Sequence, residues 1–262
     1  LLYNALSSLL TAKSSILQFK QIIREMIADF ETIKIDTKLV KPKVGIVGEV
    51  LIKYHPFGNN EVIKVLEEEG AEVISPDFIG FIKFVATHKI TNYKLLKTDK
   101  NKSKIFKLVI DLIELVEKDL AKELKKSKKG YLPPANIFKL QDKVEDILSI
   151  GNQTGEGWFL TAEMIEYIEH DIPNIVCVQP FACLPNHVVG KGVIKAIREK
   201  YPYANIAPID YDPGASETNQ TNRIKLLTTV AKDNLKHKTK SKKAIEIENI
   251  INEKEKSKKK IN

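Results

Sequence analysis

Four short apolar segments alternate with longer segments of helical periodicity, and this alternation constrains the fold of the chain most strongly. The segments are 44–50, 72–76, 175–178 and 205–210. They are rich in Val and Ile, and their short length with flanking Gly, Pro or polar residues is typical of strands. Strands that alternate with helices form a parallel sheet with right-handed crossovers. We therefore predict an α/β fold with a parallel, four-stranded, flavodoxin-like sheet flanked by helices.

The domain organisation follows from the helical patterns around these strands. We expect an N-terminal helical segment at 1–40, an α/β domain at 41–231 and a Lys-rich tail at 232–262. A helical insertion at about 90–150 separates the second and third strands. Apolar residues at helical spacing predict the individual helices, at 2–34, 59–70, 77 onward, 103–126, 137–149, 158–168, 188–200 and 216–236.

The positive charge of the chain is concentrated at its end. The net charge is +8, and from Lys232 onward 11 Lys face 5 acidic residues, so this tail carries +6 of it. Lys-rich tails are usually solvated and mobile. No basic patch interleaved with aromatic residues is present elsewhere, which argues against nucleic-acid binding. No apolar run approaches the length of a membrane span, and two cysteines in 262 residues fit a reducing, cytoplasmic compartment better than a disulfide framework.

The two cysteines lie on either side of the end of the third strand. Cys177 falls within the apolar run, where we expect it to be buried filler. Gln179-Pro180 should end the strand, because proline supplies no N–H to a sheet ladder. Cys183 therefore belongs to the loop beyond the carboxyl end of a strand, which is where open α/β sheets bind ligands. Backbone N–H groups there would bias its thiol toward thiolate, the form that binds metal or attacks.

Loops after all four strands should meet at one edge of a parallel sheet and form a shared pocket. Its polar candidates are Glu49, Lys53, His55, Cys183, Asn186, His187, Asp210 and Asp212. Several have simpler interpretations: His55 as a loop residue, His187 as a helix-capping residue and Asp212 as part of a turn. The glycine-rich segment 151–157 fits either an anion cradle or a flexible connector. The glycines near residue 45 are too few for a dinucleotide-binding motif.

Three kinds of chemistry could use Cys183. A Cys–His hydrolase needs a third orienting group and an oxyanion hole, and Cys183 with His187 supplies only the pair. The spacing of Cys177, Cys183 and His187 does not match a zinc site. An iron–sulfur cluster uses thiolates that often come from distant segments, so Cys183 fits one if its partners lie elsewhere.

Four long motifs resemble the acyl-CoA dehydratase activase-related proteins, which are linked to the 2-hydroxyacyl-CoA dehydratase activases. They are KPKVGIVGEVLIKYHP at 41–56, GEGWFLTAEM at 155–164, QPFACLPNH at 179–187 and IDYDPGASE at 209–217. The resemblance extends from about residue 20 to residue 231. It implies an ATPase activase module fused to an α/β region that holds a [4Fe-4S] or double-cubane cluster through cysteines, with ATP hydrolysis driving low-potential electron transfer. Cys183 matches the position of a cluster ligand.

The chain departs from this family pattern because it has neither the ATPase module nor the upstream cysteine motifs. We therefore expect the C-terminal piece of such a protein, which is not an autonomous enzyme and uses ATP only through a module outside this chain. A complete cluster would need the missing N-terminal region, an activase or dehydratase subunit, or a homodimer. The alternative is a non-catalytic docking module that binds such a subunit through the helical insertion. A third option is a pocket for a CoA ester at the same edge.

Overall fold

The computed structural model describes residues 16–214 and 216–237. The chain divides into two compact units. A helical unit takes Leu1–Val40 and Asp77–Ala162, and an α/β unit takes Lys41–Pro76 and Glu163–Asn262. The first part of the predicted N-terminal helix and most of the predicted Lys-rich tail lie outside the described residues.

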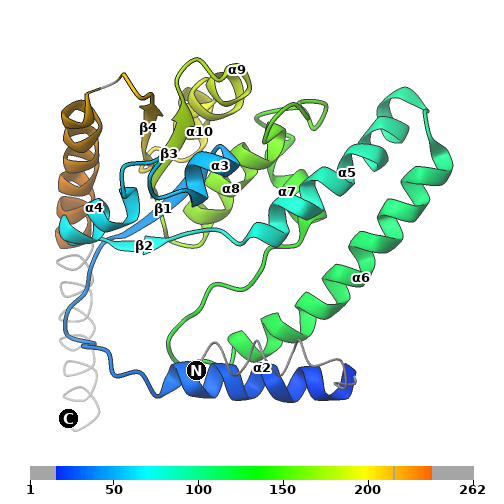
Figure 1. Cartoon of the computed structure of the whole chain (residues 1–262), viewed down its shortest axis with the longest axis horizontal. Coiled ribbons are helices and arrows are strands. Elements are labelled where there is room, and N and C mark those ends of the chain that lie inside the picture. The colour runs from blue at the N-terminus through cyan, green and yellow to red at the C-terminus, as the bar shows by residue number, and fades with distance from the viewer. Residues whose placement is uncertain (1–15, 215, 238–262) are drawn as a thin grey trace, which may run out of the picture. The chain divides into compact units, whose positions relative to one another are not determined.

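A four-stranded parallel sheet forms the centre of the α/β unit (Figure 1). Its strands are β1 (Lys43–Gly48), β2 (Glu72–Ile74), β3 (Asn174–Pro180) and β4 (Asn205–Tyr211). They lie in the order β2-β1-β3-β4, and all three pairings are parallel. The predicted α/β fold with a flavodoxin-like parallel sheet is confirmed.

Strand β3 is longer than predicted and includes both Gln179 and Pro180. It pairs with β1 only as far as Val178, opposite Gly48, but continues along β4 to the pair Pro180–Tyr211. Beyond Val178 it therefore has a neighbour on one side only. The missing N–H of Pro180 costs no ladder bond on the β1 side, which is why proline is tolerated there.

Helices on the two sides of the sheet bury its apolar side chains. The helices of this unit are α3 (Val50–Tyr54), α4 (Val62–Glu68), α9 (Leu184–Asn186), α10 (Ile194–Lys200) and a helix over residues 217–237. Val62 and Leu66 of α4 pack with Ile224 and Leu227 of the last helix against apolar residues of β1, β3 and β4. Burying each such side chain contributes about 1.5–3 kcal/mol, so this cluster is a main source of stability for the sheet.

Helix α8 (Gly157–Glu169) also approaches the sheet closely. A Cβ added to Gly45 of β1 would lie 2.5 Å from the Tyr167 ring, well inside van der Waals contact. Glycine at this position lets the α8 aromatic ring pack directly on the backbone of β1.

The helix predicted at 188–200 is broken in the structure. A π-helical turn, η1 (His187–Lys191), lies between α9 and α10, and the amide of Gly192 donates to the carbonyl of His187 at 2.8 Å. A Cβ on Gly192 would lie 2.6 Å from the carbonyl oxygen of Val188. Glycine therefore permits the wide turn, and π-helical turns of this kind are frequent at functional sites.

The helical unit is built on an antiparallel pair, α5 (Phe78–Leu96) and α6 (Lys100–Leu124), with α2 (Ile16–Glu31) alongside α6 (Figure 1). It also contains α7 (Ile137–Val144) and the first turns of α8. Phe84 of α5 stacks on Phe159 with ring centroids 5.5 Å apart, and Trp158 is fully buried beside them. Trp158 and Phe159 therefore belong to the core of the helical unit.

A buried lysine ties three segments of the helical unit together. Lys83 of α5 is 1% exposed, and its Nζ lies 3.2 Å from Glu114 and 2.5 Å from Glu117, both on α6. It also donates to the carbonyl oxygen of Ala135 at 2.9 Å. Burial raises the pKa of Glu117, an effect that the hydrogen bond from Lys83 partly offsets.

Candidate functional site

The carboxyl ends of β1 and β3 meet at the topological switch point of the sheet. The chain leaves β1 toward β2 on one side, and β3 lies on the other side of β1 (Figure 1). Ligands of open α/β sheets bind at such points. The two strands approach closely here, since the Glu49 amide donates to the Val178 carbonyl at 3.0 Å. Gly48 has a φ of +139°, and a Cβ on it would collide with that carbonyl.

The loop that follows β3 presents Cys183 at this switch point. Ala182 adopts the left-handed conformation with φ +59°, which is uncommon for a residue with a side chain. Cys183 then caps α9, is half-buried, and forms no disulfide among the described residues. Its neighbours Phe181 and Leu184 are 67% and 73% exposed. The cysteine thus lies between two apolar side chains that face solvent.

His187 fastens this loop through its ring. Its Nδ1 lies 2.9 Å from the carbonyl oxygen of Cys183, and its backbone amide donates to the same oxygen at 3.0 Å. Because a carbonyl only accepts hydrogen bonds, Nδ1 carries the proton and Nε2 is left to face other groups. Nε2 lies 3.8 Å from a carboxylate oxygen of Asp210 at the end of β4.

Asp210 is the centre of a polar network that links β3, β4 and the π-helical turn. Besides His187, it accepts a hydrogen bond from Gln179 Nε2 at 2.5 Å and lies 4.0 Å from Lys191 Nζ. The next residue, Tyr211, is buried, and this burial raises the pKa of its phenol, which stays neutral. Three nitrogen groups, from Gln179, His187 and Lys191, thus face one carboxylate, and this network orients the loop after β3.

Two amide side chains at this edge are buried without full hydrogen bonding. Asn186 is fully buried, yet neither its Nδ2 nor its Oδ1 has a hydrogen-bond partner among the described residues. Gln179 is also fully buried, and its Oε1 lacks a partner within the same described residues. Each such group costs about 1–3 kcal/mol relative to a paired one. Native proteins contain few of them, and they call for a specific explanation.

The other expected site residues form local or buried contacts. Glu49 caps α3 by accepting from the Ile52 amide at 2.7 Å, and His55 Nδ1 accepts from the Gly58 amide at 3.1 Å. Asp212 accepts from the Gly214 amide at 3.2 Å, as expected for a turn. These contacts give each of the three side chains a structural role in its own loop.

Lys53 lies in a buried ion pair. Its Nζ is 3.3 Å from Glu163 of α8, and the two side chains are 2% and 6% exposed. The pair joins α3 to α8 within the α/β unit.

The structure therefore brings together only part of the expected set. Asn186, His187 and Cys183 share the loop after β3, and Asp210 joins them through His187. Sequence reasoning missed Gln179, Lys191 and Glu163. Gln179 was expected only to end the strand, where polar residues are ordinary, and Lys191 and Glu163 gave no local signal either.

The thiols available for metal binding are few. Cys177 is fully buried, as expected, and pairs with Val47 and Pro208 in the centre of the sheet. Within residues 16–214 and 216–237, no group of three or more His, Cys, Asp or Glu side chains is arranged to hold a metal ion. A cubane cluster takes four thiolates, so the described part of the chain does not form a complete cluster site.

Comparison with known proteins adds no relative: no family model, no curated protein and no solved structure matches the chain. No helix among the described residues combines the length and the apolar character needed to span a membrane.

Proposed function

We propose that the chain is an electron-transfer component related to the 2-hydroxyacyl-CoA dehydratase activases, with Cys183 as one thiolate ligand of an iron–sulfur cluster. The observation that carries the proposal is the position of Cys183. It is a half-buried thiol in the loop at the β1/β3 switch point, within the motif 179–187 on which the family resemblance rests. Accessible thiols held in a structured polar loop are the ones that become ligands or nucleophiles.

The cluster would be shared with another polypeptide region, because the chain offers one accessible thiol and a cubane needs four. The exposed side chains of Phe181 and Leu184 on either side of Cys183 support this arrangement. Apolar groups exposed around a reactive residue are typical of a surface that another protein covers. The remaining ligands would come from a polypeptide region outside this chain, an activase or dehydratase subunit, or a second copy.

The side chains around Cys183 would act as positioning groups. His187 holds the Cys183 carbonyl through two hydrogen bonds, and Asp210 faces the other nitrogen of its ring. When bound, a [4Fe-4S] or double-cubane cluster supplies one-electron transfer at low potential. Hydrogen bonds and burial around a ligand sulfur tune that potential. ATP would act through a module outside this chain, in a reducing cytoplasm, and the chain would not be an autonomous enzyme.

Anaerobic reconstitution with iron and sulfide tests the assignment. The chain would be reconstituted together with the polypeptide that carries the ATPase module, as wild type, Cys183→Ser and Cys177→Ser. We expect Cys183→Ser to lower the bound iron and sulfide, since it removes a ligand. Cys177→Ser is the matched control, because that thiol is buried in the sheet. Full cluster content in folded Cys183→Ser would show that Cys183 is not a ligand.

A further inference from the structure

Helix α6 exposes a continuous stripe of aliphatic side chains. Six large residues on one face are between 42% and 62% exposed: Ile105, Leu108, Val109, Leu112, Leu115 and Val116. A stripe from residue 105 to residue 116 is about 16 Å long at 1.5 Å per residue. Single exposed apolar residues are ordinary, but a contiguous apolar surface marks an interaction site.

The spacing of these residues is that of a helix–helix seam. Ile105, Leu108, Leu112 and Leu115 occupy successive a and d positions of a heptad, and Val109 and Val116 lie beside them. The opposite side of α6 carries the buried residues Ser103 and Ile110 and the partners of Lys83. The stripe is therefore a second apolar face, separate from the one that packs into the helical unit.

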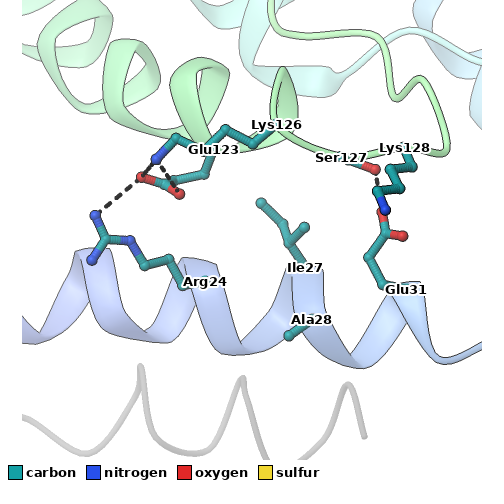
Figure 2. A pocket seen from close by; sticks show the side chains of 8 residues that line it. All are labelled: Arg24, Ile27, Ala28, Glu31, Glu123, Lys126, Ser127 and Lys128. Carbon is teal, nitrogen blue, oxygen red and sulfur yellow. Dashed lines mark hydrogen bonds and ion pairs between the residues drawn. The ribbon is translucent and has the colours of Figure 1, made fainter.

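The same face of α6 already pairs with a helix at its C-terminal end. Asp119 and Glu123 follow the stripe at heptad spacing, and they form ion pairs with Lys20 and Arg24 of α2 at 3.1 and 3.2 Å. Figure 2 shows Arg24 and Lys126 converging on Glu123 at the edge of a hollow of about 430 Å³ between the two helices. The exposed stripe lies directly before this α2–α6 contact along α6.

Charge then restricts what can lie on the stripe. The exposed charged residues of α6 are six lysines and a single acid, Asp111. Its other acids are engaged elsewhere: Glu114 and Glu117 with Lys83, and Asp119 and Glu123 with α2. The lysines are Lys100, Lys102, Lys104, Lys107, Lys118 and Lys122.

At this heptad spacing Lys104 and Lys118 are the lysines directly beside the stripe, at g positions, and Asp111 between them is paired with Lys107 at 2.8 Å. Lys102 and Lys122 are paired with Asp99 and Asp119. An apolar face with lysines along one edge is complementary to an apolar face with carboxylates along its edge.

We propose that residues 105–116 of α6 dock an amphipathic helix of another protein, with a Leu/Ile stripe flanked by Asp and Glu. A second copy of α6 would bring the same lysines and be repelled. Residues 1–15 of this chain contain one Lys and no acid, so they cannot neutralise the α6 lysines. An anionic membrane is less suited, because heptad spacing and the adjoining α2 contact are features of helix pairing. This inference does not depend on the cluster assignment.

A designed three-heptad peptide tests the proposal by fluorescence anisotropy with the whole chain. One version carries Leu and Ile at a and d with Glu at e and g, and the matched version carries Lys at e and g. We expect the Glu version to bind at least about tenfold more tightly, with affinity falling as salt is raised. Leu112→Asp should abolish binding with an unchanged melting temperature, because Leu112 is 55% exposed. Leu226→Asp, on the helix over residues 217–237 and 68% exposed, is the control and should bind normally.

Four results would overturn the proposal. The first is no binding of the Glu peptide, and the second is equal binding of both peptides. The third is either a dimer in light scattering or binding to phosphatidylglycerol vesicles, in each case abolished by Leu112→Asp. A dimer would assign the stripe to a second copy, and vesicle binding would assign it to a membrane. The fourth is protection of Leu108→Cys from maleimide in the isolated chain, which would show that the chain covers its own stripe. Rapid labelling of that cysteine is the result we expect.

Discussion

Two buried polar clusters, one in each unit, differ in how completely they are hydrogen-bonded. Lys83 in the helical unit is 1% exposed and satisfies its ammonium group with Glu114, Glu117 and the carbonyl oxygen of Ala135. Asn186 in the α/β unit is fully buried, and neither polar atom of its side chain has a partner among the described residues. A satisfied cluster fixes structure, whereas an unsatisfied amide lowers stability. Residues that break a local rule in this way concentrate at functional sites.

Removal of the Lys83 ammonium should lower the free energy of unfolding more than any other substitution proposed here. Lys83→Met leaves Glu114 and Glu117 as neighbouring, partly buried carboxylates without their cation. Breaking a buried ion pair from one side typically costs about 3–5 kcal/mol. We expect the free energy of unfolding, measured with urea, to fall by about this amount. A change below about 1 kcal/mol would show that the cluster is hydrated or unimportant.

The Lys53–Glu163 pair allows the loss of a buried cation to be tested within the α/β unit as well. Lys53→Met should lower the free energy of unfolding by about 3 kcal/mol, because Glu163 stays buried without this cation. Adding Glu163→Leu should recover part of the loss, with a coupling energy of about 0.5–3 kcal/mol in the double-mutant cycle. If the stability change of the double variant equalled the sum of the two single-variant changes, the two side chains would not interact in solution.

His88 should make the stability of the helical unit depend on pH, with a smaller effect than the two ion pairs. Burial, with a contribution from Lys89, lowers the pKa of His88 below its ordinary value of 6.5. The unfolded chain therefore takes up this proton first as the pH falls, and the folded state loses stability from about pH 6.5 down to the lowered pKa. In His88→Gln the loss over this window should be smaller than in wild type. Identical pH profiles of urea unfolding for the two proteins would exclude this contribution.

The sequence allowed the fold to be predicted well because strand and helix patterns are local. Val and Ile runs located the β strands, and the burial of Cys177 followed from its place in one of them. Glycine and proline effects were harder to judge. Pro180 is tolerated because β1 has already ended beside β3, and the π-helical turn depends on the packing around Gly192. Neither condition is visible in a single segment.

The candidate site was only partly predictable, since its key contacts join distant residues. Lys53 and Glu163 are 110 positions apart, and Lys83 and Glu117 are 34 apart. No local pattern pairs them. Asn186 was expected to face a pocket as a polar loop residue, but its side chain is completely buried. Cys183 was easier to place, because the end of an apolar strand identifies the loop that follows it.

Replacing Asn186 by leucine tests most directly whether the carboxyl edge of the sheet keeps an unsatisfied amide at the expense of stability. Asn59→Leu is the matched control, because Asn59 is also buried but bonds to the Ile52 carbonyl at 2.7 Å and to the Val62 amide at 3.2 Å. Urea unfolding of both variants and wild type gives the comparison. We expect Asn186→Leu to raise the free energy of unfolding by about 1–3 kcal/mol and Asn59→Leu to lower it. A loss of stability in Asn186→Leu as large as that in Asn59→Leu would contradict the assignment.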